Sequence, residues 1–199
     1  MNALSSPAAL RNRGAILEVI RPLLPAHGLV LEVASGTGEH VAHFAAALTG
    51  LRFQPSDPSD EARASVAAHC AGLANVLPPL ALDVALADWP VVAADVILCI
   101  NIVHISPWAA TEGLMAGAGR LLPAGGLLLL YGPFVRDGVA LAPSNAAFDA
   151  DLRARNARWG LRRVADVEAC AAGAGLRLEG VVAMPANNLT LLFRKGVQP

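Results

Sequence analysis

A glycine-rich turn stands out as the segment of this chain best suited to hold a ligand. Residues 31–40 read LEVASGTGEH, which is typical of a buried strand, a tight turn and the start of a helix. Gly36 and Gly38 let the backbone turn sharply and come close to a ligand, where a side chain would collide. Open α/β sheets bind ligands at the carboxyl ends of their strands. The pattern therefore predicts a binding site at this turn.

The residues of the turn narrow the range of ligands that could bind there. A dinucleotide fingerprint would need a third glycine where the chain has Val41, which disfavours a nicotinamide dehydrogenase, and the P-loop lysine is absent. Glu32 precedes Gly36 by four residues, and a carboxylate there repels a pyrophosphate but favours a cationic ligand. The pattern E-x-x-x-G-x-G is the usual shape of the first motif of Rossmann-like methyltransferases. We therefore expect S-adenosylmethionine as the cofactor, held by Glu32, Ser35, Gly36 and Gly38.

Two further acids follow later strands. Asp57 lies about 20 residues beyond the glycines, where a carboxylate accepts hydrogen bonds from ribose hydroxyls. Asp83 follows the next apolar run, at the place where methyltransferases set a residue against adenine. Pro55-Ser56-Asp57-Pro58 is also ordinary turn chemistry, so a structural role for Asp57 stays open. Together the acids and glycines predict one cofactor site.

Three residues are candidates for the transfer itself. Asn101 and Tyr131 end apolar runs, and Asn101 is also expected to contact the cofactor, because it lies at the rim where cofactor and acceptor meet. His104 lies in the loop after Asn101, where it is the best-placed general base. Methyl transfer depends mainly on alignment of the reacting atoms, so a base matters only where the nucleophile must lose a proton. A structural role for His104 and Tyr131 is the alternative interpretation. The segment NIVH also differs from the [DN]-P-P-[YF] tetrad, which argues against a DNA adenine or glutamine methyltransferase.

Arginines crowd into residues 153–163, around Asn156 and Trp159. They form either a solvated helix face or an acceptor site in which Arg153, Asn156 and Trp159 contact an acidic substrate. His40 and His43 lie three residues apart without a third ligand at suitable spacing, so no metal site is expected.

Apolar runs of strand length alternate with helix-length segments and would position these residues. Strands are expected at 29–34, 51–54, 76–82, 94–101, 126–132, 176–184 and 188–194. Helices are expected at 9–24, 39–49, 59–72, 107–122, 145–158 and 164–174. This alternation predicts a doubly wound α/β fold, and the last two runs predict an antiparallel pair at one edge.

Composition is consistent with a compact globular chain. The 199 residues are 55% hydrophobic and carry a formal net charge of −1, so a DNA-binding surface is not expected. The apolar runs are too short to span a bilayer, no signal peptide is expected from the N-terminal residues, and three scattered cysteines suit a reducing compartment. We expect one cytoplasmic domain over residues 1–199.

With these residues in hand, the sequence resembles the methyltransferase-like 26 family over nearly its whole length. The shared blocks are LEVASGTGEHVAHFA at 31–45, FQPSD at 53–57, INIVHISPW at 100–108, YGPF at 131–134, SNAAFDADLRARNARWGLR at 144–162 and MPANNLTLLFRK at 184–195. The resemblance implies a Rossmann-like class I methyltransferase with a mostly parallel seven-stranded sheet, an antiparallel last strand and helices on both faces.

The resemblance also implies roles for the flanking segments. Residues 1–25 would be an N-terminal helical extension with Arg11 and Asn12 on the cofactor side, although Leu10 replaces an expected glutamate. Residues 135–163 would be a substrate-side insertion. The expected function is methyl transfer to a small molecule, with an RNA or protein acceptor left open. The alternative is a non-catalytic module that binds S-adenosylmethionine or a protein partner.

Overall fold

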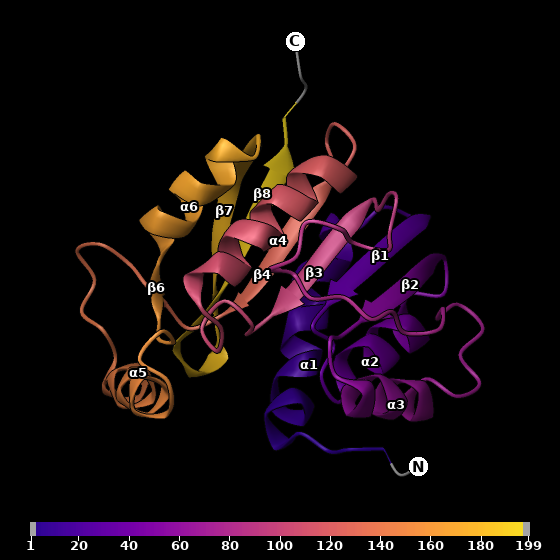
Figure 1. The fold of residues 1–199 in the computed structure, drawn as a ribbon, viewed down its shortest axis with the longest axis horizontal. Helices are drawn as coiled ribbons and strands as arrows, with labels where there is room; N and C mark the ends of the chain where they lie inside the picture. Colours follow the sequence, from indigo (N-terminus) through magenta and orange to yellow (C-terminus); the bar gives the residue numbers. More distant parts are fainter. Residues whose placement is uncertain (1–2, 197–199) are drawn as a thin grey trace.

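A twisted sheet forms the centre of the molecule, seen in Figure 1 in the computed structural model, which describes residues 3–196. The outermost residues of the expected extension and domain, 1–2 and 197–199, lie outside the described residues. The strands are β1 (Gly28–Val33), β2 (Leu51–Ser56), β3 (Val96–Ile100), β4 (Leu127–Gly132), β5 (Phe134–Val135), β6 (Arg162–Arg163), β7 (Leu176–Met184) and β8 (Asn188–Lys195).

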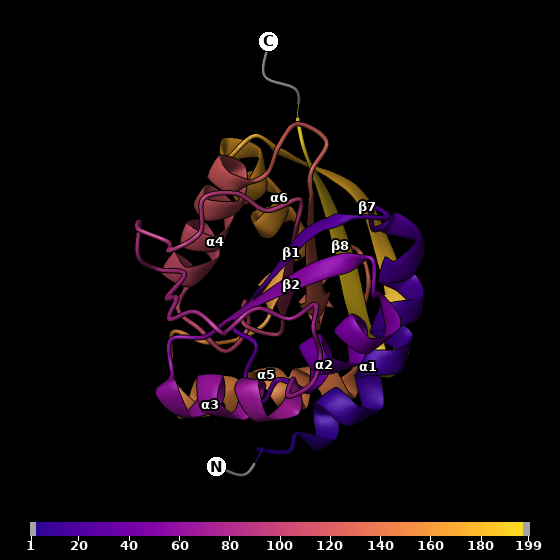
Figure 2. The same cartoon turned by 90° about the vertical axis from the view of Figure 1, so that its right-hand side faces the viewer.

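Helices cover both faces of the sheet, as expected for this class (Figure 2). They are α1 (Pro7–Ile20), α2 (Glu39–Ala47), α3 (Asp60–His69), α4 (Trp108–Leu121), α5 (Pro143–Arg155) and α6 (Val164–Gly173), with short 3-10 turns at Arg21–Leu23 and Pro185–Asn187. Helices α4 and α6 pack on one face, and α1, α2 and α3 pack on the other. None of the helices within residues 3–196 is both long and apolar enough to cross a membrane.

Alternation along the strands builds two separate cores. Leu128 and Leu130 of β4 face the core under α4 and α6, whereas Leu127 and Leu129 face the core under α1 and α2. Successive side chains of a strand point to opposite faces, so an unbroken apolar run such as LLLL fills both cores at once. This confirms the interpretation of the continuous runs as strands buried on both sides.

The sheet has six strands in the order β2-β1-β3-β4-β8-β7, one fewer than expected. The missing strand is the run 76–82, which touches β2 only through isolated bridges at Val76 and Leu80. Pro78 and Pro79 lie between those bridges and have no amide hydrogen to donate to a ladder. The chain therefore follows β2 without forming a regular strand.

Strand order also fixes where a ligand can bind. The β1–β2, β1–β3 and β3–β4 pairs are parallel, whereas β8 runs antiparallel to β4 and β7, which confirms the antiparallel last strand and the late pair. The chain leaves β1 toward β2 and later returns to the other side of β1 as β3, so the order reverses there. Such a switch point opens a crevice at the carboxyl ends of the strands.

Residues 136–161 form a separate segment beside that end of the sheet. The parallel pair β5–β6 joins the two ends of the segment, with Phe134 opposite Arg162 and Val135 opposite Arg163. Helix α5 lies within it, near the carboxyl ends of the strands (Figure 1). The segment lies within the range 135–163, whose role as a substrate-side insertion stays a prediction.

Candidate active site

The turn between β1 and α2 is held in a left-handed conformation at three positions. Ala34, Gly36 and Gly38 have φ values of 55°, 57° and 92°. A Cβ on Gly38 would lie 2.7 Å from the Val66 Cα atom, so this glycine lets α3 pack closely. A Cβ on Gly36 would meet nothing within 4 Å. Open space beside the Gly36 backbone is what a ligand held by the turn requires.

Glu32 carries a buried carboxyl group with an unpartnered oxygen. The residue is 2% exposed, and its Oε2 atom has no hydrogen-bond partner among the described residues. Burial, with a smaller contribution from the nearby Asp57 charge, raises the Glu32 pKa to about 7. A carboxyl group in this state becomes favourable as an anion when a cation or a hydrogen-bond donor comes beside it. This orphaned acceptor fits the positively charged cofactor that the sequence predicts.

Asp57 connects the end of β2 to the glycine turn. Its Oδ2 atom accepts a hydrogen bond from the Gly36 amide at 3.0 Å, and Oδ1 accepts one from the Ser59 amide at 3.0 Å. Ser35 is also buried, and its backbone amide donates to the Ser56 carbonyl at 2.9 Å. The structure therefore brings the predicted residues of the first two strand ends together around one turn.

A cavity of about 370 Å³, here called the central cavity, opens beside β3 and β4. It is lined by Ala8, Asn12, Asn101, Ile105, Tyr131, Pro133, Asn145, Phe148, Ala186 and Asn188. Three of the predicted residues, Asn12, Asn101 and Tyr131, meet there although they come from three different elements. Arg11 lines an adjoining cavity of about 280 Å³ beside α1. The central cavity combines amides and a phenol with apolar walls and has no charged lining residue.

A chain of hydrogen bonds fixes two of these polar groups. The His40 Nε2 atom lies 2.8 Å from the Asn12 Oδ1 atom, and burial lowers the His40 pKa to about 4, so the ring is neutral. Asn12 also interacts with the Tyr131 hydroxyl, and this interaction partly opposes the rise in the Tyr131 pKa that burial causes. His40 is thus bonded to Asn12 and positions it.

Asn101 stands at a strained point of the backbone. Its φ is +66°, and its amide donates to the Tyr131 carbonyl at 2.8 Å, which holds the residue against the end of β4. The other non-glycine residues of positive φ within 3–196 are Ala34, Ala186 and Asn187, and Ala186 lines the same cavity. Strained backbone of this kind gathers at ligand sites because the surrounding fold must impose it.

His104 is buried more completely than its predicted role requires. The residue has no exposed surface, and neither ring nitrogen has a hydrogen-bond partner among the described residues. The ring packs edge-on against Phe134 at 4.6 Å, and a Cβ on Gly132 would lie 2.4 Å from Nε2. Burial and the nearby Arg162 charge lower the His104 pKa to about 3. Its imidazole is therefore neutral and sealed from solvent.

The predicted substrate residues lie apart from the central cavity. Arg153 is exposed and bonds to Asp149 at 2.9 Å, while the Asn156 Oδ1 atom accepts from the Arg158 amide at 3.0 Å. Trp159 is half-buried under the Arg155 guanidinium, which lies 5.2 Å from the ring centroid. Of the three, Arg153 lines a different and more open cavity of about 610 Å³. The predicted contact with an acidic substrate there stays a prediction.

Arg162 has a structural task that the sequence did not suggest. Its guanidinium donates to the carbonyls of Val103, Ser106 and Arg158 at 3.2, 2.9 and 2.8 Å. These bonds fasten the loop that carries His104 to the segment after α5. Arg162 therefore stabilises the backbone of this loop and is not a free surface charge.

Asp83 lies apart from the central cavity, and three residues that were not predicted line that cavity. Asp83 is exposed, and its Oδ1 atom accepts from the Ala85 amide at 2.9 Å, so its predicted contact with adenine stays a prediction. The sequence analysis missed Asn145, Phe148 and Asn188, which line the central cavity. Helix α5 is otherwise mostly polar, and its two large apolar side chains are buried Leu152 and partly exposed Phe148, so an apolar residue outside the buried face was the signal that could have identified Phe148.

Solved structures with the same fold are methyltransferases. CalO1, a methyltransferase of calicheamicin biosynthesis in its SAH-bound form, matches at 21% identity with a TM-score of 0.73, over 96% of this chain and 61% of that chain. An O-methyltransferase family 2 protein from Planctomyces limnophilus in complex with apigenin matches at 20% identity and 0.75, over 94% and 59%. The mitomycin 7-O-methyltransferase MmcR matches at 16% identity and 0.80, over 95% and 54%.

These matches establish the fold as a Rossmann-like methyltransferase fold. The chain spans between 54% and 61% of the length of these three solved proteins. The resemblance to the methyltransferase-like 26 family stays an interpretation of the motifs. A family model described as "Protein of unknown function (DUF938)" matches residues 3–195, and the chain belongs to this family.

Proposed function

We propose that this protein is an S-adenosylmethionine-dependent methyltransferase that acts on a small-molecule acceptor. The observation that carries the proposal is the buried Glu32 carboxyl, with its unpartnered Oε2 atom beside a glycine turn that leaves space at Gly36. A buried carboxyl without a partner is costly unless a ligand supplies one. The fold shared with solved methyltransferases supports the same assignment.

In the proposal each residue of the turn has a defined task. Glu32 balances the positive charge of the cofactor, and Asp57, already bonded to the Gly36 amide, accepts the ribose hydroxyls with its remaining lone pairs. Bound S-adenosylmethionine supplies a methyl group activated by its sulfonium. The protein then has mainly to align the acceptor with that methyl group.

The central cavity is the proposed acceptor site. Its uncharged lining suits a neutral hydroxylated group, and Asn101, Asn12 and Tyr131 supply directional hydrogen bonds around it. In the proposal His104 is the general base only if acceptor binding changes the surroundings of its ring. A pKa of about 3 leaves its ring neutral, but so weak a base helps little unless acceptor binding changes its surroundings.

Calorimetric titration with S-adenosylmethionine, S-adenosylhomocysteine and NAD in parallel tests the cofactor. We expect micromolar affinity for the two adenosyl ligands and none for NAD. Binding of a cation lowers the Glu32 pKa below about 7, so affinity for S-adenosylmethionine should rise from pH 6 to pH 8 with release of protons. If none of the three ligands binds, the proposal is contradicted.

A second assay separates transfer from binding. The protein is incubated with methyl-labelled S-adenosylmethionine and a panel of phenolic acceptors, and labelled product is counted. Transfer to any member of the panel supports the enzyme. Tight cofactor binding without transfer to that panel or to cell metabolites would favour the non-catalytic alternative.

A further inference from the structure

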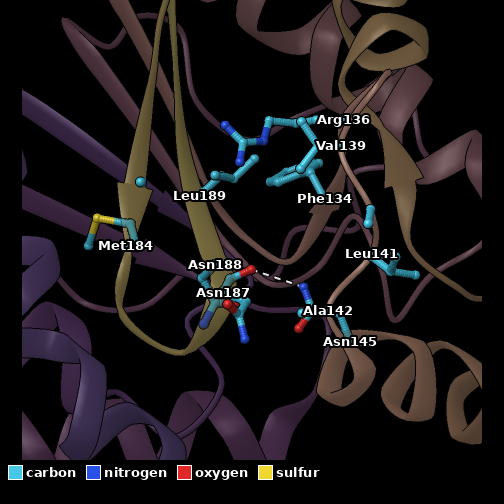
Figure 3. Close-up of a pocket in the computed structure, with 12 residues that line it drawn as sticks. Phe134, Arg136, Val139, Leu141, Ala142, Asn145, Met184, Asn187, Asn188 and Leu189 are labelled. Carbon is cyan, nitrogen blue, oxygen red and sulfur yellow. Dashed lines mark hydrogen bonds between the residues drawn. The ribbon is translucent and has the colours of Figure 1, made fainter.

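A second cavity lies on the other side of Asn145 and Asn188 from the central cavity. This side cavity has a volume of about 210 Å³ and lies between the loop after β5, the start of α5 and the β7–β8 hairpin (Figure 3). Asn145 and Asn188 line both cavities. The two spaces are therefore separated by little more than two amide side chains.

One cation and a set of apolar side chains give the side cavity its chemical character. Phe134, Val139, Leu141, Met184 and Leu189 form its apolar walls. Arg136 is its only charged lining residue, and Figure 3 shows the guanidinium extending over Leu189. Other arginines of this region bond to Asp149, Asp151 and Asp137, but Arg136 has no ion-pair partner within residues 3–196.

The start of α5 adds to the positive potential. Ala142, the N-cap of this 13-residue helix, and Asn145 in its first turn both line the side cavity, and no side chain caps the helix. The amide hydrogens of a helix's first turn and the helix dipole favour negative charge. Asn145 is only 7% exposed, and its Nδ2 atom donates to the Asn187 carbonyl at 2.9 Å, so this side chain is held in place at the edge where the two cavities adjoin.

We propose that the side cavity binds the carboxylate end of an apolar organic acid, with Arg136 as its ion-pair partner. The volume suits a group of about the size of benzoate, and the apolar walls exclude a bare inorganic anion as the preferred ligand. This inference rests on the proposed function in one respect: the acid is the far end of the acceptor whose reacting hydroxyl lies in the central cavity. Asn145 and Asn188 then lie alongside the middle of the acceptor.

Methionine methyl groups offer a direct measurement of binding. The chain has three methionines, of which Met184 lines the side cavity, Met115 lies in the opposite core under α4, and Met1 is outside the described residues. The protein is labelled with ¹³C-methyl methionine and titrated with benzoate, 3-phenylpropionate and the corresponding primary amides. We expect the acids to shift the Met184 signal, to leave Met115 in place, and to bind about tenfold more tightly than the amides.

Arg136→Gln should abolish the preference for acids over amides, whereas Arg52→Gln, an equal charge change at the exposed residue of β2, should leave it intact. Inorganic phosphate should leave Met184 unshifted. The inference is overturned if no acid shifts Met184, if phosphate shifts it equally, or if Arg136→Gln keeps the preference.

The same samples are titrated with S-adenosylhomocysteine by calorimetry. Cofactor binding without acid binding would remove this inference and leave the proposed function standing. Acid binding without cofactor binding would remove the proposed function and leave an organic-acid site.

Discussion

Glu32 and His104 are both buried without complete hydrogen bonding, yet their surroundings differ in kind. Glu32 is the penultimate residue of β1, before the glycine turn, and burial brings its pKa to about 7, inside the working range of a protein. His104 lies under Gly132 and Phe134 with a pKa of about 3. A ligand or a small change of pH can alter the charge of Glu32, but no ordinary pH alters that of His104.

Burial has a different effect in each of the two regions. At the β1–α2 turn, burial prepares a carboxyl group for a partner that arrives from outside. In the loop after β3, burial keeps an imidazole neutral and packed, with Arg162 bonding the neighbouring carbonyls of Val103 and Ser106. The first region is suited to binding, and the second to holding the loop of Asn101 in place.

The largest expected effect is from Glu32→Gln. Loss of the charge that faces the cofactor should weaken S-adenosylmethionine binding about 100-fold in calorimetry at pH 8. Glu168→Gln, on the exposed face of α6, is the matched control and should bind normally. Equal affinity in the two variants would remove Glu32 from the site.

The same substitution should stabilise the ligand-free protein. The folded pKa of about 7 is above the ordinary glutamate value of 4.5, so the folded state holds more protons between these values and stability falls as pH rises from 4.5 to 7. Above pH 7 the full penalty, about 3 kcal/mol, is present. Urea unfolding at pH 8 should therefore show Glu32→Gln as more stable, with the gain vanishing near pH 4.5.

Gly132→Ala tests how tightly His104 is enclosed. The new methyl group would lie 2.4 Å from the His104 Nε2 atom, and we expect a loss of about 3 kcal/mol in the free energy of unfolding. The double variant Gly132→Ala/His104→Ala should recover only the part of that loss that comes from the clash, because the Gly132 φ of +157° strains an alanine whatever the space. Gly14→Ala, with nothing within 4 Å, should instead stabilise helix α1 by about 0.8 kcal/mol. Additive losses in the double variant would show that the two sites do not touch.

Acid should destabilise the protein through His104. Its folded pKa of about 3 lies below the ordinary histidine value of 6.5, so the unfolded state binds more protons in that interval and stability falls as pH drops below 6.5. Between pH 6.5 and 5 the loss approaches about 2 kcal/mol for this one group.

His104→Leu should flatten that part of the stability curve in urea unfolding, while exposed His27→Ala leaves its slope unchanged. His104→Gln serves if the leucine variant does not fold. An unchanged acid slope in both variants would contradict the sealed imidazole. In the labelled-cofactor assay, a drop in turnover with intact cofactor affinity would support His104 as base.

The smallest effect concerns Tyr131, which is the single tyrosine of the chain and can be titrated alone by ultraviolet absorbance. Burial raises its pKa, and the hydrogen bond from Asn12 partly opposes the rise. Asn12→Ala should therefore raise the Tyr131 pKa further. His40→Ala should do so to a lesser extent, since it only orients Asn12, and Asn156→Ala should have no effect. A fall in the pKa on removal of Asn12 would contradict the chain of hydrogen bonds.

Most of the fold was predictable because apolar periodicity and turn residues specify local structure. The runs 29–34 and 126–132 are continuous and apolar, and each forms a strand within one residue of its expected bounds. The prediction of a strand at 76–82 was wrong, because this apolar run contains two prolines that cannot donate hydrogen bonds to a ladder. Strand pairing depends on backbone hydrogen bonds, which hydrophobicity alone does not report.

The binding side of the site was more predictable than the acceptor side for a physical reason. Glu32, Gly36 and Asp57 lie at strand ends, so the sheet fixes them once the strands are known. Asn145 and Asn188 reach the cavities from a helix and a hairpin whose positions depend on tertiary packing. The arginine cluster is conspicuous in composition, yet the arginine that lines the side cavity is Arg136, which lies outside that cluster.

The place of β8 in the sheet has a consequence for synthesis on the ribosome. Strand β8 lies between β4 and β7, so β7 cannot join the sheet until β8 has been made. The growing chain therefore carries an open β4 edge of sequence LLLLY until residues near Lys195 have emerged. An exposed apolar edge of this kind invites pairing with other chains. Nascent chains stalled before β8 should thus be strong clients of ribosome-associated chaperones.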